Sequence, residues 1–218
     1  MREVNLLAAL PATKRQLEKR AAAQTPKNIA IARQYGAEYF DGSRDVGYGG
    51  YSYDGRWLPV ARDMVDHFGL KPGDRVLDVG CAKGFLVKDL MLTCPGLEVF
   101  GLDISKYALT HCEPAVIGRL HLGSADSLPF PDNSFSAVIS LNTIHNFDRA
   151  GAIRAMREIE RLAPGRGFVQ VDSYHSSEQR DLFMSWVLTA KFHDYPDGWL
   201  SLFSEAGYTG DYYWTIIS

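Results

Sequence analysis

The chain has 218 residues, a length that suits one domain with modest additions better than two full domains. Hydrophobic residues make up 46% of it and charged residues 22%, which excludes a disordered chain and a fibre. The net charge of −3 gives no overall basic field to attract nucleic acid or an anionic membrane. No apolar run approaches the length of about 20 residues that a membrane span needs. Three cysteines without C-x-x-C spacing favour reduced thiols, so we expect a cytoplasmic protein.

The amino-terminal part of the chain has the pattern of short helices. Thr13 predicts the cap of a helix through Gln24, which is rich in Lys, Arg and Ala. Thr25 followed by a proline is typical of a second helix start, and Gly36 is its expected end. Before Gly69, three apolar residues recur at intervals of four and predict a third helix: Val60, Met64 and Phe68.

Between these helices, seven aromatic residues fall within residues 35–57: Tyr35, Tyr39, Phe40, Tyr48, Tyr51, Tyr53 and Trp57. Residues 39–57 have no helical or strand period and contain five glycines, so they are expected to form a loop. We predict that this stretch folds over the ligand site as a lid. The alternative is a local hydrophobic cluster that pins a long loop to the domain.

From Asp74 onward, short apolar runs alternate with helical stretches. The expected strands are 75–79, 97–103, 119–122, 137–141 and 167–172, and the expected helices are 85–92, 148–162, 177–191 and 199–206. Such alternation predicts an α/β fold with a doubly wound, mostly parallel Rossmann-like sheet and helices on both faces. Ligands of such sheets bind outside the carboxyl ends of the strands. We therefore divide the chain into amino-terminal helices with a lid (1–70) and a core (71–218) with an insertion at about 173–198.

The strongest local signal is the run from Val76 to Phe85, where a strand enters a turn of small residues and then a helix. Gly80 and Gly84 allow tight backbone geometry and a close approach of main-chain N–H groups to a ligand. A dinucleotide site needs G-x-G-x-x-G, but Ala82 and Phe85 occupy its second and third glycine positions. Because a bulky third residue obstructs helix–strand packing, the run argues against a nicotinamide oxidoreductase.

The same run resembles the first motif of the class I S-adenosylmethionine-dependent methyltransferases, D-x-G-x-G-x-G. Asp78, Gly80 and Gly84 match this motif, and Ala82 replaces the middle glycine. Later stretches are similar to the same family: Asp103 after the second strand, Gly123–Phe135 after the third, Ser140–Phe147 at the fourth and Leu162–Gly167 before the fifth. The resemblance covers roughly residues 74–172. Relatives close the sheet with an antiparallel pair, whereas this chain supplies one clear strand near its carboxyl end, at 212–217.

The resemblance implies S-adenosylmethionine as the cofactor. It places Asp103 against the ribose hydroxyls and Asp126 against the adenine amino group. We expect Arg56 to pair with the cofactor's carboxylate, a contact that suits a guanidinium. The other expected cofactor contacts are Asp78, Gly80, Cys81, Ala82, Gly84, Ile104, Ala125, Leu141, Asn142, Tyr48 and Tyr51. No spacing predicts a metal site.

For the reaction, we expect in-line transfer in a dry, lidded site, where positioning supplies most of the acceleration. His145 follows the fourth strand, as in many relatives with small-molecule acceptors, and its pKa range suits a catalytic base. The alternative is that His145 only shapes the pocket wall. The expected acceptor contacts are Tyr39, Tyr48, His145, Tyr174 and His193.

These patterns favour a methyltransferase that acts on N or O of a small polar metabolite. An RNA or protein methyltransferase is the alternative, because Lys14, Arg15, Lys19 and Arg20 make one local basic helix although the overall balance is acidic. A non-catalytic S-adenosylmethionine-binding protein is a further alternative. The amino-terminal helices are candidates for a homodimer surface, and no feature indicates a membrane partner.

Overall fold

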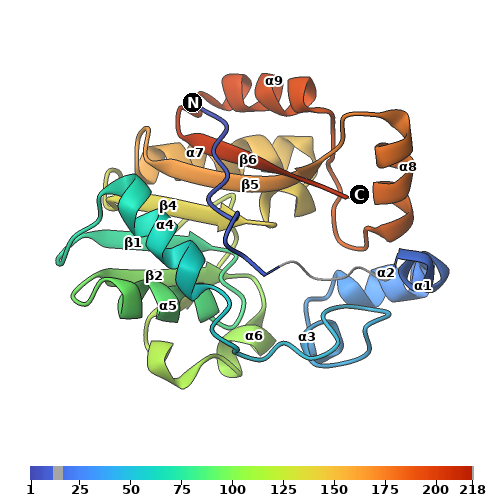
Figure 1. Cartoon of the computed structure of the whole chain (residues 1–218), viewed down its shortest axis with the longest axis horizontal. Coiled ribbons are helices and arrows are strands. Elements are labelled where there is room, and N and C mark those ends of the chain that lie inside the picture. The colour runs from blue at the N-terminus through green and yellow to red at the C-terminus, as the bar shows by residue number, and fades with distance from the viewer. Residues whose placement is uncertain (12–16, 218) are drawn as a thin grey trace.

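The computed structural model describes residues 1–11 and 17–217 and is built on one six-stranded sheet (Figure 1). The strands are β1 (Arg75–Val79), β2 (Glu98–Asp103), β3 (Leu120–Leu122), β4 (Ala137–Leu141), β5 (Gly167–Ser173) and β6 (Asp211–Ile216). They lie in the order β3-β2-β1-β4-β5-β6, and each neighbouring pair is parallel. The order reverses direction between β1 and β4, so a ligand crevice is expected at their carboxyl ends. The doubly wound parallel sheet is confirmed.

Helices cover both faces of this sheet. One face packs on α4 (Leu58–Phe68) and α5 (Phe85–Thr93), and the other on α7 (Arg149–Leu162) and α9 (Pro196–Ala206). Successive side chains of a strand point to opposite faces, so Val76 joins the first core and Leu77 the second. Burial on both faces is the reason that the strands read as continuous apolar runs.

Local signals set most helix ends where the sequence predicts them. The Ser105 hydroxyl accepts from the Ala108 N–H and begins α6 (Lys106–Thr110). Asp148 accepts from the Gly151 N–H at 2.8 Å and begins α7. Gly69 is left-handed, with φ of 58°, and ends α4.

The amino-terminal helices are shorter than predicted. The described residues include α1 (Leu17–Ala23), α2 (Pro26–Ala32) and α3 (Ala37–Phe40), and the Thr25 hydroxyl caps α2 by accepting from the Asn28 N–H. The helix expected to reach Gly36 ends at Ala32, and Tyr35 has a φ of 49° that no helix continues. The short helix α3 therefore includes the first residues of the segment expected to be a loop. The predicted cap Thr13 and the basic residues Lys14 and Arg15 lie outside the described residues.

The insertion contains one helix, α8 (Ser177–Trp186). Its cap is Ser176 rather than Ser177, because the Ser176 hydroxyl accepts from the Gln179 N–H. The helix ends at Trp186 instead of Lys191, since Val187 is extended, with φ of −70° and ψ of 140°.

The carboxyl-terminal strand β6 is confirmed, but it pairs parallel to β5 and no antiparallel partner follows it among the described residues. Tyr208 and Thr209 do not form a strand. Instead, the amino terminus lies along β6. The Tyr212 N–H donates to the Arg2 carbonyl at 3.0 Å, and the Val4 N–H donates to the Tyr212 carbonyl at 2.9 Å. The guanidinium of Arg2 also pairs with Asp211 at 2.9 Å. The edge that a hairpin would cover is thus partly covered by the start of the chain.

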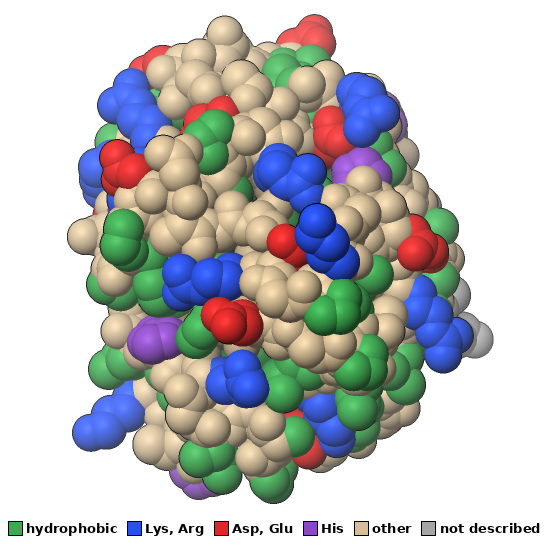
Figure 2. Space-filling view, turned by 90° about the vertical axis from the view of Figure 1, so that its left-hand side faces the viewer, with side chains coloured by type: hydrophobic (Ala, Val, Ile, Leu, Met, Phe, Trp, Pro, Cys, Tyr) green, Lys and Arg blue, Asp and Glu red, His purple; other side chains and the backbone are tan. Residues whose placement is uncertain are grey.

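The end of the sheet opposite the ligand crevice carries charges of both signs. Figure 2 shows this face, where Lys and Arg are interspersed with Asp and Glu instead of forming one basic surface. None of the helices within residues 1–11 and 17–217 has the length and apolar character needed to cross a bilayer.

Gly80 leaves no room for a side chain in the glycine turn. It has a φ of +85°, and an added Cβ would lie 1.8 Å from the Thr143 hydroxyl. We expect Gly80→Ala to lower the free energy of unfolding in urea by about 3 kcal/mol, from overlap and left-handed strain together. In the Gly80→Ala background, Thr143→Ala should recover only the part of the lost free energy of unfolding that comes from overlap with the Thr143 side chain. Wild-type stability of Gly80→Ala would contradict this account.

Candidate functional site

Two adjoining cavities lie at the carboxyl ends of β1, β2 and β4, with volumes of about 180 and 60 Å³. Five residues line both: Tyr48, Gly80, Ala82, Leu141 and Asn142. The larger cavity extends to Asp103 and the end of β2, and the smaller one to Asp78 in β1. A site with two such lobes at the reversal point of the sheet suits an extended ligand with chemically different ends.

The turn between β1 and α5 forms the floor of both cavities. The N–H groups of Gly80 and Cys81 donate to the Leu102 carbonyl at 2.7 and 3.1 Å, which fixes the turn to β2. Ala82 has a φ of 49°, a left-handed conformation that costs a non-glycine residue about 1 kcal/mol. Its methyl group packs with Phe40 and Ala108, and this contact offsets part of the cost.

Asp103 links the turn to the end of β2. Its carboxylate accepts from the Ala82 N–H at 2.8 Å and from the Ser105 N–H at 2.7 Å. Burial raises the pKa of Asp103, and the backbone donors oppose that rise. Each carboxylate oxygen has a further lone pair, so Asp103 can also accept from hydroxyls of a ligand in the larger cavity.

Asp78 lines the smaller cavity and is 4% exposed. Burial raises its pKa to about 7, and the nearby Asp103 carboxylate adds to the rise. In the described part of the chain, no Lys or Arg forms an ion pair with Asp78. A buried carboxylate in this state favours a ligand that brings its own positive charge. The sulfonium and ammonium groups of S-adenosylmethionine fit this requirement.

The aromatic segment covers the site. Tyr48 and Tyr51 lie with ring centroids 4.3 Å apart, and Tyr51 stacks on Phe85 at 4.8 Å with a 20° angle between the ring planes. Phe40 contacts Tyr39 and Tyr48 and is itself buried. The rings thus form a continuous cluster over the glycine turn.

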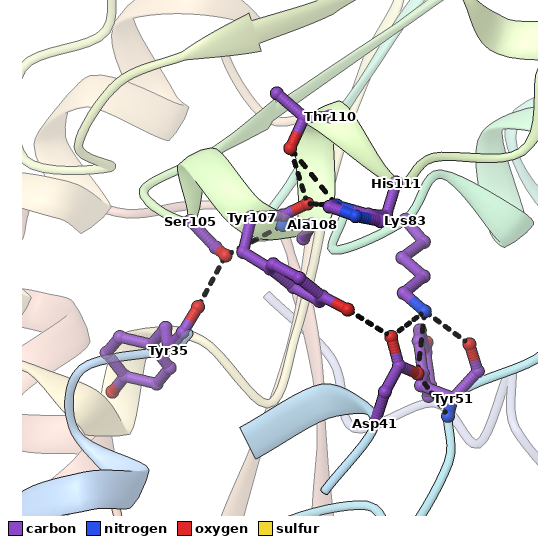
Figure 3. Close-up of polar contacts among 9 residues, drawn as sticks. All are labelled: Tyr35, Asp41, Tyr51, Lys83, Ser105, Tyr107, Ala108, Thr110 and His111. Atoms are coloured by element: carbon purple, nitrogen blue, oxygen red, sulfur yellow. Dashed lines mark hydrogen bonds and ion pairs between the residues drawn. The ribbon is translucent and has the colours of Figure 1, made fainter. Parts of the chain in front are cut away.

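Polar contacts anchor this cover to the core (Figure 3). The ammonium of Lys83 donates to both carboxylate oxygens of Asp41, at 2.7 and 2.8 Å, and to the Tyr51 carbonyl at 3.0 Å. The Tyr107 hydroxyl donates to Asp41 at 2.8 Å. The Ser105 hydroxyl donates to the Tyr35 carbonyl at 2.5 Å. These contacts join the cover to the β1 turn and to α6.

The insertion meets the amino-terminal segment at the rim of the larger cavity. The side-chain amide of Gln24 donates to the carbonyls of Met184 and Val187, each at 2.6 Å. A guanidinium nitrogen of Arg33 donates to the Ala190 carbonyl at 3.4 Å. Segments far apart in the sequence therefore meet beside the cavity, and α1 packs against α8 (Figure 1).

His145 lies behind the cavity wall. It is 4% exposed and lines neither cavity. Its Nδ1 accepts from the Asp172 N–H at 3.4 Å, and its carbonyl accepts from Lys191 and Phe192. Burial lowers the pKa of His145, although the Asp172 carboxylate opposes this. The next residue, Asn146, does line the larger cavity.

The structure brings many of the predicted residues together. The two cavities are lined by the predicted residues Asp78, Gly80, Cys81, Ala82, Asp103, Ile104, Ala125, Leu141, Asn142, Tyr39, Tyr48 and Tyr51.

Other predicted residues lie elsewhere, for identifiable reasons. Arg56 pairs with Asp54 at 2.6 Å and lines neither cavity. Asp126 accepts from Arg154 at 2.9 Å and from the Ser124 hydroxyl and does not line the cavity. Gly84 lies behind the turn, where an added Cβ would meet Val116 at 2.7 Å.

The predicted acceptor contacts Tyr174 and His193 pair with each other instead of facing the cavities. The Tyr174 hydroxyl and the His193 Nδ1 are 3.0 Å apart, and Tyr174 is buried against Phe183. Burial lowers the pKa of His193.

Sequence reasoning missed several residues that line the larger cavity, among them Arg33, Tyr35, Thr143, Asn146 and Lys191. Tyr35 belongs to the aromatic run, and Asn146 adjoins His145, so both had a usable signal. Arg33 and Lys191 had none, because only the tertiary contact between α2 and the insertion brings them to the site.

Comparison with known proteins extends these observations. Residues 77–170 match the model of a methyltransferase domain. A demethylmenaquinone methyltransferase of Symbiobacterium thermophilum is 34% identical over 128 residues, which are 55% of this chain and 50% of that protein. The mouse (Mus musculus) protein called Probable tRNA methyltransferase 9B is 36% identical over 112 residues, 50% of this chain and 23% of that protein. The chain thus spans half or less of the length of these curated relatives.

Among solved structures, the complex of the Haloferax volcanii Trm112 methyltransferase activator with a methyltransferase has a chain of similar fold. Its TM-score is 0.57 and its identity 24%, over 69% of this chain and 67% of that one. The matched region, residues 77–170, runs from β1 into β5 and includes the glycine turn and Asp103. This match and the strand order support the assignment of residues 77–170 to the class I S-adenosylmethionine-dependent methyltransferases.

Proposed function

We propose that this protein transfers a methyl group from S-adenosylmethionine to N or O of a small polar metabolite. The observation that carries the proposal is the pair of adjoining cavities, which share the glycine turn and offer Asp78 in one lobe and Asp103 in the other. When bound, S-adenosylmethionine supplies a methyl group activated on a sulfonium. Asp78 is suited to hold the cationic methionine end, and Asp103 to accept from the ribose hydroxyls.

The enclosure of the site supports a small acceptor. The larger cavity has about 180 Å³, and residues of the amino-terminal segment and of the insertion contribute to its wall. A macromolecular substrate would need these segments to separate before its base or side chain could enter. Partial cover of the site reduces its access to water, which favours transfer to the acceptor.

The similarity to a tRNA methyltransferase makes RNA the second candidate acceptor. One basic residue of the predicted amino-terminal helix is engaged within the protein: Arg20 donates to the Arg44 carbonyl and lies 5.5 Å from the Trp186 ring centroid. The test is incubation of the protein with methyl-labelled S-adenosylmethionine and cell extract, followed by separation of metabolites, RNA and protein. We expect label in the metabolite fraction. Label confined to RNA or protein would replace the small-molecule proposal.

Asn146 is suited to orient the acceptor. Its side-chain nitrogen donates to the Asn142 carbonyl at 3.1 Å, which fixes the amide, and its Oδ1 is buried without a partner among the described residues. Because protein atoms cover this oxygen, an N–H or O–H of a ligand in the larger cavity would satisfy it once the Asn146 side chain turned toward the cavity. A hydrogen bond of this kind holds a nucleophilic atom in place without removing its proton.

The pKa of Asp78 predicts a pH-dependent affinity for S-adenosylhomocysteine, whose ammonium stays charged between pH 6 and 8. Asp78 ionises near pH 7, so we expect affinity measured by calorimetry to rise about tenfold across this interval. Asp78→Asn should bind weakly and remove the pH dependence. An equally steep pH profile in this variant would contradict the assignment.

The same carboxyl predicts how stability varies with pH. The pKa of folded Asp78, about 7, lies above that of an unfolded Asp, so the folded state binds more protons between pH 4 and 7. The contribution of Asp78 to stability is therefore greatest at low pH and falls as the pH rises toward 7. Ligand-free Asp78→Asn should accordingly melt at a higher temperature than the wild type at pH 8.

The contacts of Asp41 predict a role of the cover in binding. Asp41→Asn leaves the Lys83 ammonium without its carboxylate, so residues 41–57 should be cleaved faster by a protease. We expect affinity for S-adenosylhomocysteine to fall about fivefold and the free energy of unfolding to fall by about 1–3 kcal/mol, because the buried Lys83 ammonium loses its carboxylate. Glu38→Gln, on exposed α3, is the matched control. Unchanged protease resistance and affinity in Asp41→Asn would show that the cover is not held in this way.

The position of His145 favours a positioning role over that of a base. We expect His145→Gln to keep methyl transfer to the labelled metabolite within about tenfold of wild type from pH 7 to 9, whereas loss of a general base costs about 10²–10⁴. His145→Ala should lower the melting temperature as well, because it leaves a cavity. A loss of about 10³ in His145→Gln, with normal folding and cofactor affinity, would establish the base.

A further inference from the structure

Two cations stand on one wall of the larger cavity. Arg33 directly follows α2, and Lys191 belongs to the insertion; both line the cavity. The contact of Arg33 with the Ala190 carbonyl brings the two residues together. Neither forms an ion pair with a carboxylate within residues 1–11 and 17–217.

Other cations near the site are neutralised by the protein. Lys83 pairs with Asp41 at 2.7 Å, and Arg56 pairs with Asp54 at 2.6 Å. Among the described residues that line the larger cavity, the acidic one is Asp103, whose carboxylate already accepts from two backbone N–H groups. The wall that holds Arg33 and Lys191 therefore carries excess positive charge and favours an anion.

These cations are separate from the part of the site that suits the methionine end of the cofactor. Asp78 lines the smaller cavity, whereas neither Arg33 nor Lys191 does. Tyr48 lies at the junction of the two lobes. The cations are thus placed for a second ligand in the larger cavity.

We propose that Arg33 and Lys191 form an anion subsite and that the methyl acceptor is an amine or hydroxyl compound bearing a carboxylate or phosphate group. The subsite holds the anionic group, and Asn146 Oδ1 accepts a hydrogen bond from the compound. This inference rests on the proposed function only in placing the acceptor in the larger cavity, beside the cofactor's ribose on Asp103. The anion subsite itself can be tested without turnover.

The first experiment is titration of the protein, saturated with S-adenosylhomocysteine, with inorganic phosphate at low ionic strength, followed by NMR chemical shifts. We expect saturable binding that weakens with salt and is at least about tenfold weaker in the double variant Arg33→Gln/Lys191→Gln. Lys71→Gln removes one positive charge before β1, at the opposite end of the sheet, as each single variant Arg33→Gln or Lys191→Gln does at the cavity, and should bind phosphate as the wild type does. Absence of saturable binding to the wild type, or equal affinity in the double variant, overturns the proposal.

A second comparison tests the class of acceptor with 4-hydroxybenzoate and its neutral analogue 4-hydroxybenzamide. 4-Hydroxybenzoate should bind the protein saturated with S-adenosylhomocysteine at least about tenfold more tightly than 4-hydroxybenzamide does. The double variant Arg33→Gln/Lys191→Gln should lose this preference. Equal binding of the two compounds to the wild type contradicts an anionic acceptor.

The affinity for S-adenosylhomocysteine separates this inference from the proposed function. The double variant should keep it within about twofold of wild type. A loss as large as that for phosphate would assign the cations to the cofactor's carboxylate and overturn the subsite. If the wild type itself does not bind S-adenosylhomocysteine, the proposed function fails, while phosphate titration of the ligand-free protein still decides the subsite.

Discussion

The Asp103 carboxylate connects the two strand ends on which the site is built. One oxygen accepts from Ala82 in the β1 turn, and the other from Ser105 at the start of α6. These bonds hold the turn in its left-handed conformation and place the Ala82 methyl group beneath Phe40. Burial of Asp103 is unfavourable for its charge, and two backbone donors make that charge tolerable. The glycine turn that forms the floor of the site and the contact of the cover with that turn therefore both depend on the Asp103 carboxylate.

The cover depends on a second charge, the ammonium of Lys83. This residue is 8% exposed, and a buried cation without a partner would be costly. Asp41 and the Tyr51 carbonyl supply that partner from the cover itself. If the cover opened, Lys83 and Asp41 would lose their ion pair, and each charged group would have to be hydrated by itself. Access to the site is therefore coupled to the conformation of the glycine turn, which contains Lys83. The aromatic cluster adds contact area, while the ion pair between Lys83 and Asp41 fixes the position of the cover on the core.

Local patterns were enough to predict the sheet and the floor of the site. Strand β1 and its turn combine the apolar residues Val76, Leu77 and Val79 with the glycines Gly80 and Gly84, and all of these lie within ten positions of the sequence. Side-chain partners were harder to predict. Arg56 is paired with its near neighbour Asp54, and Asp126 with Arg154 from α7, and neither residue lines the two cavities. Arg33 and Lys191 meet only after the insertion packs on the amino-terminal segment, a contact that no local spacing records.

The pairing of Arg2–Val4 with β6 is a contact between segments far apart in the sequence, since Arg2 and Asp211 are separated by 209 positions. Strands β1 to β5 can pair with one another before this contact forms, because their partners all lie between them in the sequence. Joining Arg2–Val4 to β6 closes a loop around the whole core, and long loops cost more entropy to close, so this contact should form late in folding. Until it forms, the free edge of the sheet would be open to pairing with other chains.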